Sequence, residues 1–257
     1  MSGEQLIGDF AAGFRARVLA MRVAGQQLVE ERGIIALIGA VADDPDGRAL
    51  VTGDEALPVL RERGAGLAAR VVNVFAAASR CHEFLTNTGD YRPSACVAMV
   101  HQDLSSVAAT DLPEGLSLRP VIGEPGTTEG VALRDAAAAA LRSDPSASPI
   151  DDLDGFVGYL RSVPGARYVA AVDAAGIVRA TAAAAVFGHA AGVFFVNTDP
   201  AWRGRGVGTA MTAAALEAAA EAGARTACLD ASALGEGLYL RLGFRPVSAA
   251  TLFVRQG

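Results

Sequence analysis

A glycine-rich segment near the carboxyl end combines residue types that suit a phosphate-bearing ligand. The segment 203–208 has the sequence RGRGVG, follows the apolar run Val193–Val196 and a short polar stretch, and precedes a long alanine-rich stretch. Glycine has no Cβ atom to keep a ligand from the backbone, and the first turn of a helix offers unpaired N–H groups at the positive end of its dipole. The pattern predicts a strand, an anion-binding turn and a helix. A turn that only reverses the chain is the simpler alternative.

Two other phosphate-binding designs compete for this loop. A P-loop requires Gly-Lys-Ser or Gly-Lys-Thr, and this chain contains no lysine. A dinucleotide-binding loop requires three spaced glycines directly after a strand, with an acidic residue about 20 residues further on. Asp230 would supply the acid, but Thr209 occupies the third glycine position. The P-loop is therefore excluded, and a nicotinamide-binding protein is the weaker alternative.

Two segments together resemble the signatures of the GNAT superfamily of N-acetyltransferases. Arg203, Gly206 and Gly208 fill the pattern Arg/Gln-x-x-Gly-x-Gly/Ala of its pyrophosphate loop. Downstream, a predicted strand that ends near Asp230 precedes the sequence LYLRLGF at 238–244, which is similar to the second signature. The resemblance covers roughly residues 116–254, and its most specific residues all follow Val193.

The resemblance implies an N-acetyltransferase that uses acetyl-CoA as cosubstrate and transfers the acetyl group to an amine by direct attack in a ternary complex. In that family, backbone N–H groups of the strand before the loop hold the thioester carbonyl and the pantetheine amides. The loop amides hold the pyrophosphate, through charge-assisted hydrogen bonds that contribute on the order of 1.5–3 kcal/mol each. Ser232 stands where the family often has an asparagine. The implied cofactor-binding residues are Val196, Thr198, Arg203, Gly204, Arg205, Gly206, Val207, Gly208 and Ser232.

Tyr239 is the predicted catalytic residue, as the general acid that protonates the leaving coenzyme A thiolate. A phenol of pKa ~10 gives its proton to a thiolate of pKa ~8.5 at a cost of about 2 kcal/mol, which is a plausible match. The alternative is a buried tyrosine whose hydroxyl only satisfies a backbone group.

No residue is nominated as the general base. The predicted strand before the loop has no acid, and the candidates Asp199, Asp230, Glu236 and His189 each have a structural alternative. A water chain, or an acceptor amine of low pKa, would also suffice. Two functions therefore stay open: an acyl-CoA-dependent N-acetyltransferase, and a non-catalytic acyl-CoA-binding sensor or regulatory module.

Composition limits the remaining classes. The net charge is −6, and no basic run offers the electrostatic footprint of a nucleic-acid-binding protein. Charged residues throughout the first 30 positions argue against a signal peptide or a membrane anchor. The three cysteines are odd in number and unpatterned, which suits a reducing cytoplasm. No metal-binding motif occurs, so no metal is expected.

The chain is expected to hold two α/β units with mixed sheets. After the turn-forming segment Leu112–Gly115, alternating and helical patterns predict the order β-α-α-β-β-β-α-β-α-β over 113–257, which is similar to the GNAT fold and ends in a strand near Thr251–Val254. Residues 1–112 are expected to form an additional α/β unit, either a degenerate GNAT-like domain or a cap on the catalytic unit. Its apolar spacing predicts a helix from about Glu4 to Arg32.

The acceptor is not identified by the sequence. A small amine, an antibiotic, an amino acid or a protein N-terminus would each fit, and the net charge of −6 slightly favours cationic or neutral acceptors. The oligomeric state is also open, with a homodimer among the options.

Overall fold

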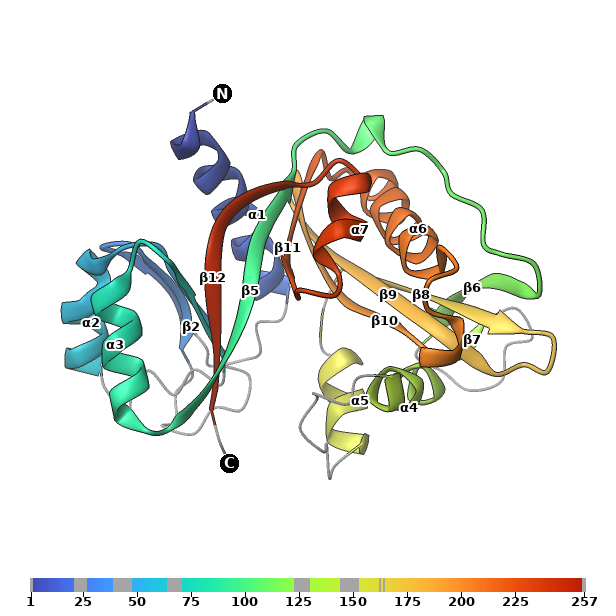
Figure 1. The fold of residues 1–257 in the computed structure, drawn as a ribbon, viewed down its shortest axis with the longest axis horizontal. Coiled ribbons are helices and arrows are strands. Elements are labelled where there is room, and N and C mark those ends of the chain that lie inside the picture. The colour runs from blue at the N-terminus through green and yellow to red at the C-terminus, as the bar shows by residue number, and fades with distance from the viewer. Residues whose placement is uncertain are drawn as a thin grey trace.

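The computed structural model of the protein describes residues 2–20, 27–38, 48–63, 71–122, 130–143, 153–161, 163 and 165–255. In these residues the strands form one mixed sheet in the order β1-β2-β3-β4-β12-β5-β11-β10-β9-β8-β6-β7, with helices on both faces (Figure 1). The helices are α1 Gly3–Ala20, α2 Leu57–Arg63, α3 Ser79–Thr88, α4 Leu133–Ser143, α5 Leu153–Arg161, α6 Val207–Glu221 and α7 Glu236–Arg241. The strands are β1 Gln27–Glu31, β2 Ile34–Ile38, β3 Arg48–Val51, β4 Val71–Phe75, β5 Tyr91–His101, β6 Leu116–Ile122, β7 Val131–Ala132, β8 Ala166–Asp173, β9 Val178–Phe187, β10 Ala190–Thr198, β11 Thr226–Ala231 and β12 Arg245–Arg255. The prediction of a mixed α/β sheet is confirmed.

The second half follows the predicted order of elements, with the two-residue strand β7 added before α4. Small side chains on β9 allow close packing against both faces of its sheet. Ala180, Ala182 and Ala184 of β9 are buried against the cluster that contains α6. Ala185 faces the other side of the sheet, where it packs with Val163. Because alternate residues of a strand face opposite sides, this alanine run lets helices approach both faces.

The predicted helix from Glu4 to Arg32 is wrong beyond its first part. The structure has α1 up to Ala20, and then places 27–31 in the strand β1, which pairs antiparallel with β2. Arg32 and Gly33 have φ of 42° and 73°, the left-handed conformation that a tight hairpin turn requires. Cross-strand pairing therefore decides the structure of this segment, where the apolar spacing alone favoured a helix.

The two halves of the sheet exchange strands. β5 comes from the first half and lies between β11 and β12, with His101 opposite Ala227 and Val100 opposite Arg245. β12 ends the chain, extends well beyond the predicted Thr251–Val254, and lies between β4 and β5 of the first half. The predicted division into 1–112 and 113–257 stays a prediction, because each half of the sheet contains a strand from the other.

The amino-terminal helix α1 packs on the second half of the sheet, against β9, β10 and β11. Phe10, Phe14 and Val18 form its buried stripe and share a cluster with residues of β5 and β11. A Cβ atom at Gly13 would lie 2.6 Å from the Sγ atom of Cys228, so only glycine allows this close approach. The helices α6 and α7 pack in the cluster on the opposite face. The first half therefore supplies a helix that covers one face of the sheet in the second half.

In the part of the chain that the structure describes, we find no helix with the length and hydrophobicity needed to cross a membrane.

Candidate functional site

The strands β10 and β11 pair over only a short distance. Their parallel pairing runs from Ala190 opposite Thr226 to Gly192 opposite Cys228, although β10 continues to Thr198. A bulge interrupts β10 after Phe194, where Phe195 has a φ of 60° and its carbonyl accepts a hydrogen bond from the Thr181 hydroxyl at 2.9 Å. Bulges bend a strand and end its pairing. The edge of β10 that faces β11 is therefore open beyond Gly192.

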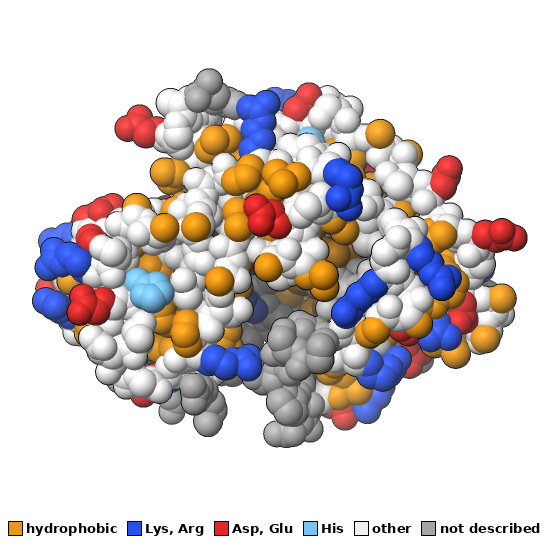
Figure 2. All heavy atoms as spheres, viewed as in Figure 1, with side chains coloured by type: hydrophobic (Ala, Val, Ile, Leu, Met, Phe, Trp, Pro, Cys, Tyr) orange, Lys and Arg blue, Asp and Glu red, His pale blue; other side chains and the backbone are white. Residues whose placement is uncertain are grey.

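The register at the end of β10 shows which N–H groups face this open edge. The N–H of Asp199 donates to the carbonyl of Arg179 on β9 at 2.7 Å. Successive residues of a strand turn their N–H groups to opposite edges. Thr198 and Val196 therefore turn theirs away from β9, toward β11. Figure 2 shows a hollow in this face of the molecule, between the positions of α7 and α5 in Figure 1.

The predicted loop lies directly beyond this edge. Gly204 and Gly206 have φ of 74° and 83°, and a Cβ atom at either position would have no other atom within 4 Å. Gly206 is the N-cap of α6 and provides no side-chain cap, and Val207 begins the helix. The first-turn N–H groups of α6 have no intrahelical acceptor. The loop therefore presents bare backbone amides at the positive end of a long helix, which suits an anion.

The third glycine serves packing. A Cβ atom at Gly208 would lie 2.8 Å from the Cδ1 atom of Leu238, so the absence of a side chain lets α6 lie against α7. The expectation that all three glycines admit a ligand to the backbone is thus replaced by two different roles: turn geometry at Gly204 and Gly206, and close packing at Gly208.

The two arginines of the loop have intramolecular partners. Arg203 donates from Nε to the carbonyl of Thr198 at 3.0 Å and from Nη2 to the carbonyl of Ser143 at the end of α4. The guanidinium of Arg205 lies 5.1 Å from the centre of the Trp202 ring. Arg203 therefore ties the loop to β10 and α4, while Arg205 is exposed and stacked beside it.

An ion-pair network fixes the turn between β10 and the loop. Arg179 of β9 contacts the carboxylates of Asp173 at 2.8 Å and Asp199 at 3.0 Å. Asp199 also accepts the N–H of Ala201 at 2.9 Å, and this bond, followed by Arg179, holds the pKa of its carboxyl below the ordinary value. Asp199 is therefore a charged structural group, which argues against its candidacy as a base.

Tyr239 lies in α7 with 8% of its surface exposed. Burial raises the pKa of its hydroxyl to about 12. Its ring packs edge-on against Phe244 at 5.8 Å, and no described residue forms a hydrogen bond with its hydroxyl. The alternative of a hydroxyl that only satisfies a backbone group thus finds no partner in this part of the structure. A Cβ atom at Gly235 would lie 2.9 Å from the Tyr239 ring and 3.6 Å from the Ser232 hydroxyl, so Gly235 lies between these two side chains.

Of the other candidates for a base, Asp230 is occupied and His189 is remote. Asp230 accepts from Arg17 of α1 at 3.3 Å and from Asn73 of β4, and its side chain is 7% exposed. His189 lies in the turn before β10, at the end opposite the loop. Glu236 begins α7 three residues before Tyr239. Its backbone N–H donates to the carbonyl of Ser232 at 3.0 Å, and its carboxylate has no hydrogen bond or ion pair with a described residue. No base is assigned.

The buried contact of Arg17, Asp230 and Asn73 was not predicted from the sequence. A Cβ atom at Gly192 would lie 2.5 Å from the Cβ atom of Arg17, so the Arg17 side chain covers the last residue of β10 that pairs with β11. The three residues come from α1, β11 and β4. Arg17 and Asp230 are 213 positions apart, so no local pattern signals their meeting.

Within the described residues, no group of three or more histidine, cysteine, aspartate or glutamate side chains is placed to hold a metal ion.

Comparisons with known proteins agree with this fold. Residues 164–246 match the family model of the acetyltransferase (GNAT) domain. A GCN5-related N-acetyltransferase from Kribbella flavida has a similar structure, with a TM-score of 0.61 and 19% identity, over 96% of this chain and 94% of that one. A GCN5-related N-acetyltransferase from Sphaerobacter thermophilus gives 0.57 and 19%, over 88% and 78%. A tandem GNAT protein from the clavulanic acid biosynthesis pathway gives 0.53 and 16%, over 93% and 86%. The search of curated proteins found no match.

Proposed function

Since this chain has the GNAT fold and carries a GNAT acetyltransferase domain at 164–246, we propose that it is an acyl-CoA-dependent N-acetyltransferase. The single observation that carries the proposal is the open edge of β10, which leads directly into a glycine turn at the start of α6. An extended acyl-CoA can lie along such an edge while its diphosphate meets the turn.

The proposed binding mode uses mainly backbone groups. The N–H groups of Val196 and Thr198 hold the thioester carbonyl and the pantetheine amides of acetyl-CoA. The amides of Gly204 to Gly208 hold the pyrophosphate, and α6 directs its dipole at the same point. Arg203 supports the loop through its contacts with Thr198 and Ser143, so its contribution to phosphate binding is indirect.

In the proposed reaction, the acceptor amine attacks the acetyl carbonyl of the bound thioester. The tetrahedral intermediate then loses the coenzyme A thiolate, and the Tyr239 hydroxyl protonates that sulfur. The amine proton leaves through water and restores the hydroxyl. Because burial raises the pKa of Tyr239 to about 12, full transfer to a thiolate of pKa ~8.5 costs about 5 kcal/mol, more than the sequence suggested. If the amine proton returns to the hydroxyl through water in the same step as C–S cleavage, no free buried phenolate forms.

A thiol-release assay with acetyl-CoA and a panel of amines tests this proposal. The three cysteines are buried, and burial raises their pKa values to about 11 for Cys81 and about 12 for Cys96 and Cys228. A disulfide reagent therefore reports coenzyme A alone while the protein is folded. Amine-dependent thiol release that is lost in Tyr239→Phe supports the enzyme. Tight coenzyme A binding without thiol release from any amine supports the sensor. Absence of coenzyme A binding defeats both.

A further inference from the structure

The amino-terminal helix α1 lies across the point where β10 and β11 separate. A Cβ atom at Gly13 would lie 2.7 Å from the Cβ atom of Cys228 on β11 and 3.1 Å from the carbonyl oxygen of Ala191 on β10. One helical turn later, a Cβ atom at Gly192 would lie 2.5 to 3.2 Å from the Cβ, Cγ and Cδ atoms of Arg17. Gly192 and Cys228 form the last pair between the two strands. One side of α1 therefore contacts both strands where their pairing ends.

The Arg17 side chain continues from β10 to β11. Its Nη2 atom lies 3.3 Å from Oδ2 of Asp230, and the two side chains are 9% and 7% exposed. Asp230 is two residues beyond Cys228, so it lies on the same face of β11 but past the last pair. Arg17 therefore joins the two strands through its side chain at the point where their backbone pairing has ended.

Two donors from the first half fix the orientation of the Asp230 carboxylate. Arg17 of α1 donates to Oδ2, and the side-chain amide of Asn73 on β4 donates to Oδ1. Taking an ion pair out of water has a desolvation cost that can exceed the attraction between the charges, so stability alone is a weak reason for a buried pair. A role in placing the strands accounts better for this contact.

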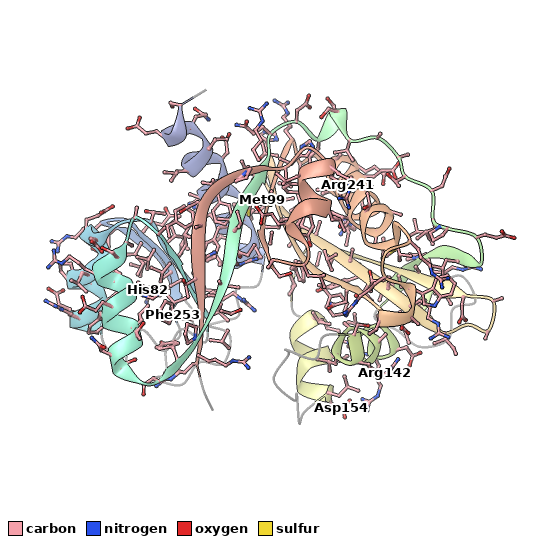
Figure 3. All side chains as sticks on the ribbon, viewed as in Figure 1. His82, Met99, Arg142, Asp154, Arg241 and Phe253 are labelled. Atoms are coloured by element: carbon pink, nitrogen blue, oxygen red, sulfur yellow. The ribbon has the colours of Figure 1, made fainter. Side chains whose placement is uncertain are left out.

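The opposite face of the split holds the proposed acid. Leu229 and Ala231 of β11 pack in the cluster that contains Tyr239. Met99 of β5, labelled in Figure 3, lies opposite Leu229 and belongs to the same cluster. β11 ends at Ala231, and α7 with Tyr239 begins at Glu236. The position of β11 therefore sets the position of Tyr239, while β10 carries the N–H groups proposed to hold acyl-CoA.

We propose that Arg17 is a positioning residue for acetyl transfer. By joining β10 to β11 at their split, it fixes the place of the thioester on β10 relative to the Tyr239 hydroxyl on α7. The inference rests on the proposed function, and adds that the first half of the chain sets the geometry of a site whose proposed groups belong to the second. Such a contact matters because a displacement of about 1 Å can lower a reaction rate roughly a hundredfold.

Kinetics of Arg17→Met and Arg17→Lys, with calorimetry of coenzyme A, test the inference. Arg17→Met keeps an apolar side chain over Gly192 but removes the contact with Asp230, so kcat for amine-dependent thiol release is expected to fall about tenfold. The Kd for coenzyme A should stay within about twofold, because the loop 203–208 lies at the other end of β10. Arg17→Lys keeps the charge and is expected to recover most of the lost kcat.

A double variant separates positioning from stability. Arg17→Met leaves the buried Asp230 carboxylate without its guanidinium, which lowers the melting temperature. Arg17→Met combined with Asp230→Asn removes both charges and is expected to regain the melting temperature while kcat stays low, because the strands remain unjoined. Arg15→Met is the matched control on α1, since it removes only an exposed pair with Glu30, and should leave kcat unchanged.

The outcomes distinguish the inference from the proposed function. An unchanged kcat in Arg17→Met, or a kcat that recovers together with the melting temperature in the double variant, overturns the inference. A Kd for coenzyme A that rises in step with the loss of kcat also overturns it, because Arg17 would then act on cofactor binding. Absence of amine-dependent thiol release from the unaltered protein contradicts the proposed function itself.

Discussion

The two halves of the molecule contain the same local arrangement of strands and helix, but the two parallel strands pair differently in each half. In each, a strand leads through a turn into a helix, and the next strand along the chain is parallel to the first: β3, α2 and β4 in the first half, and β10, α6 and β11 in the second. β3 pairs with β4 along its whole length, from Arg48 opposite Val71 to Val51 opposite Val74. β10 leaves β11 after Gly192. Within the described residues, the two parallel strands separate in the second half and stay paired in the first.

The turn after β3 and the turn after β10 also differ. The second half has bare glycine backbone, whereas the first half fills its turn with its own carboxylates. Asp54 accepts the N–H groups of Arg80 at 2.8 Å and Cys81 at 3.2 Å, and so occupies the start of α3. A Cβ atom at Gly53 would lie 2.2 Å from the Glu55 carboxylate. A phosphate would meet negative charge there. The comparison teaches that the strand, helix and parallel strand occur in both halves, while among the described residues the bare glycine turn of the proposed phosphate site occurs in the second half.

Removal of the Tyr239 hydroxyl is expected to have the largest effect on the second half. We predict that Tyr239→Phe lowers kcat about a hundredfold or more, because the thiolate loses its proton donor. Coenzyme A affinity and the melting temperature should change little, since the hydroxyl has no hydrogen bond to a described residue. Steady-state kinetics and calorimetry measure both. An unchanged kcat would exclude Tyr239 as the acid.

Backbone strain introduced into the loop 203–208 is expected to weaken coenzyme A binding. Gly206→Ala places a Cβ atom on a residue with a φ of 83°, at a cost of about 1 kcal/mol. Because the amides then move, we expect the Kd for coenzyme A to rise about tenfold. Gly176→Ala in the β8–β9 turn is the matched control, with a φ of 80° and equally open surroundings. Equal changes in Kd for both variants would show that the loop has no special role.

Loss of the Arg179 network should have a smaller effect. Arg179→Met frees Asp199 and the turn behind the loop, so the KM for acetyl-CoA is expected to rise about threefold to fivefold at constant kcat. Arg134→Met breaks the exposed pair with Asp154 and should leave both constants unchanged. A fall in kcat with constant KM would mean that Arg179 acts elsewhere.

The first-half turn should affect stability alone. Asp54→Ala removes the acceptor for two N–H groups of α3, which is expected to cost about 1 kcal/mol of unfolding free energy. Coenzyme A should still bind once per chain, because β3 and β4 stay paired. Denaturant titration and calorimetry check the two expectations. Altered acetyl-CoA kinetics would contradict the division of roles between the turns.

The smallest effect near neutral pH is expected from the buried thiols and the buried phenol, whose contribution to stability changes only at alkaline pH. Burial raises the pKa of Cys96 and Cys228 from 9.0 to about 12 and that of Tyr239 from 10.0 to about 12. The unfolded chain loses these protons first, so their contribution to stability is complete below about pH 9 and falls as the pH rises toward 12. Unfolding monitored from pH 7 to 11 should show no loss of stability from these groups below about pH 9 and an increasing loss above it. Rapid thiol labelling of the folded protein at pH 8 would contradict their burial.

Local patterns predicted much of the second half. The glycine-rich segment 203–208, the alanine-rich stretch after it, and the alternating and helical patterns specify the strand, loop and helices where they occur. The strand β1 was missed because its pairing with β2 outweighs the helical spacing. The strand exchange and the contact of Arg17 with Asp230 were also missed, since they join distant parts of the chain. The base, the acceptor and the domain boundary stay open for the same reason: contacts between elements decide them.

A crystal structure with coenzyme A tests the central claim most directly. The account predicts one coenzyme A per chain, with its pyrophosphate on the amides of 204–208, its pantetheine arm along the open edge of β10, and its sulfur beside the Tyr239 hydroxyl. Coenzyme A bound at the turn after β3, or with its sulfur on the far side of the sheet from Tyr239, would contradict it.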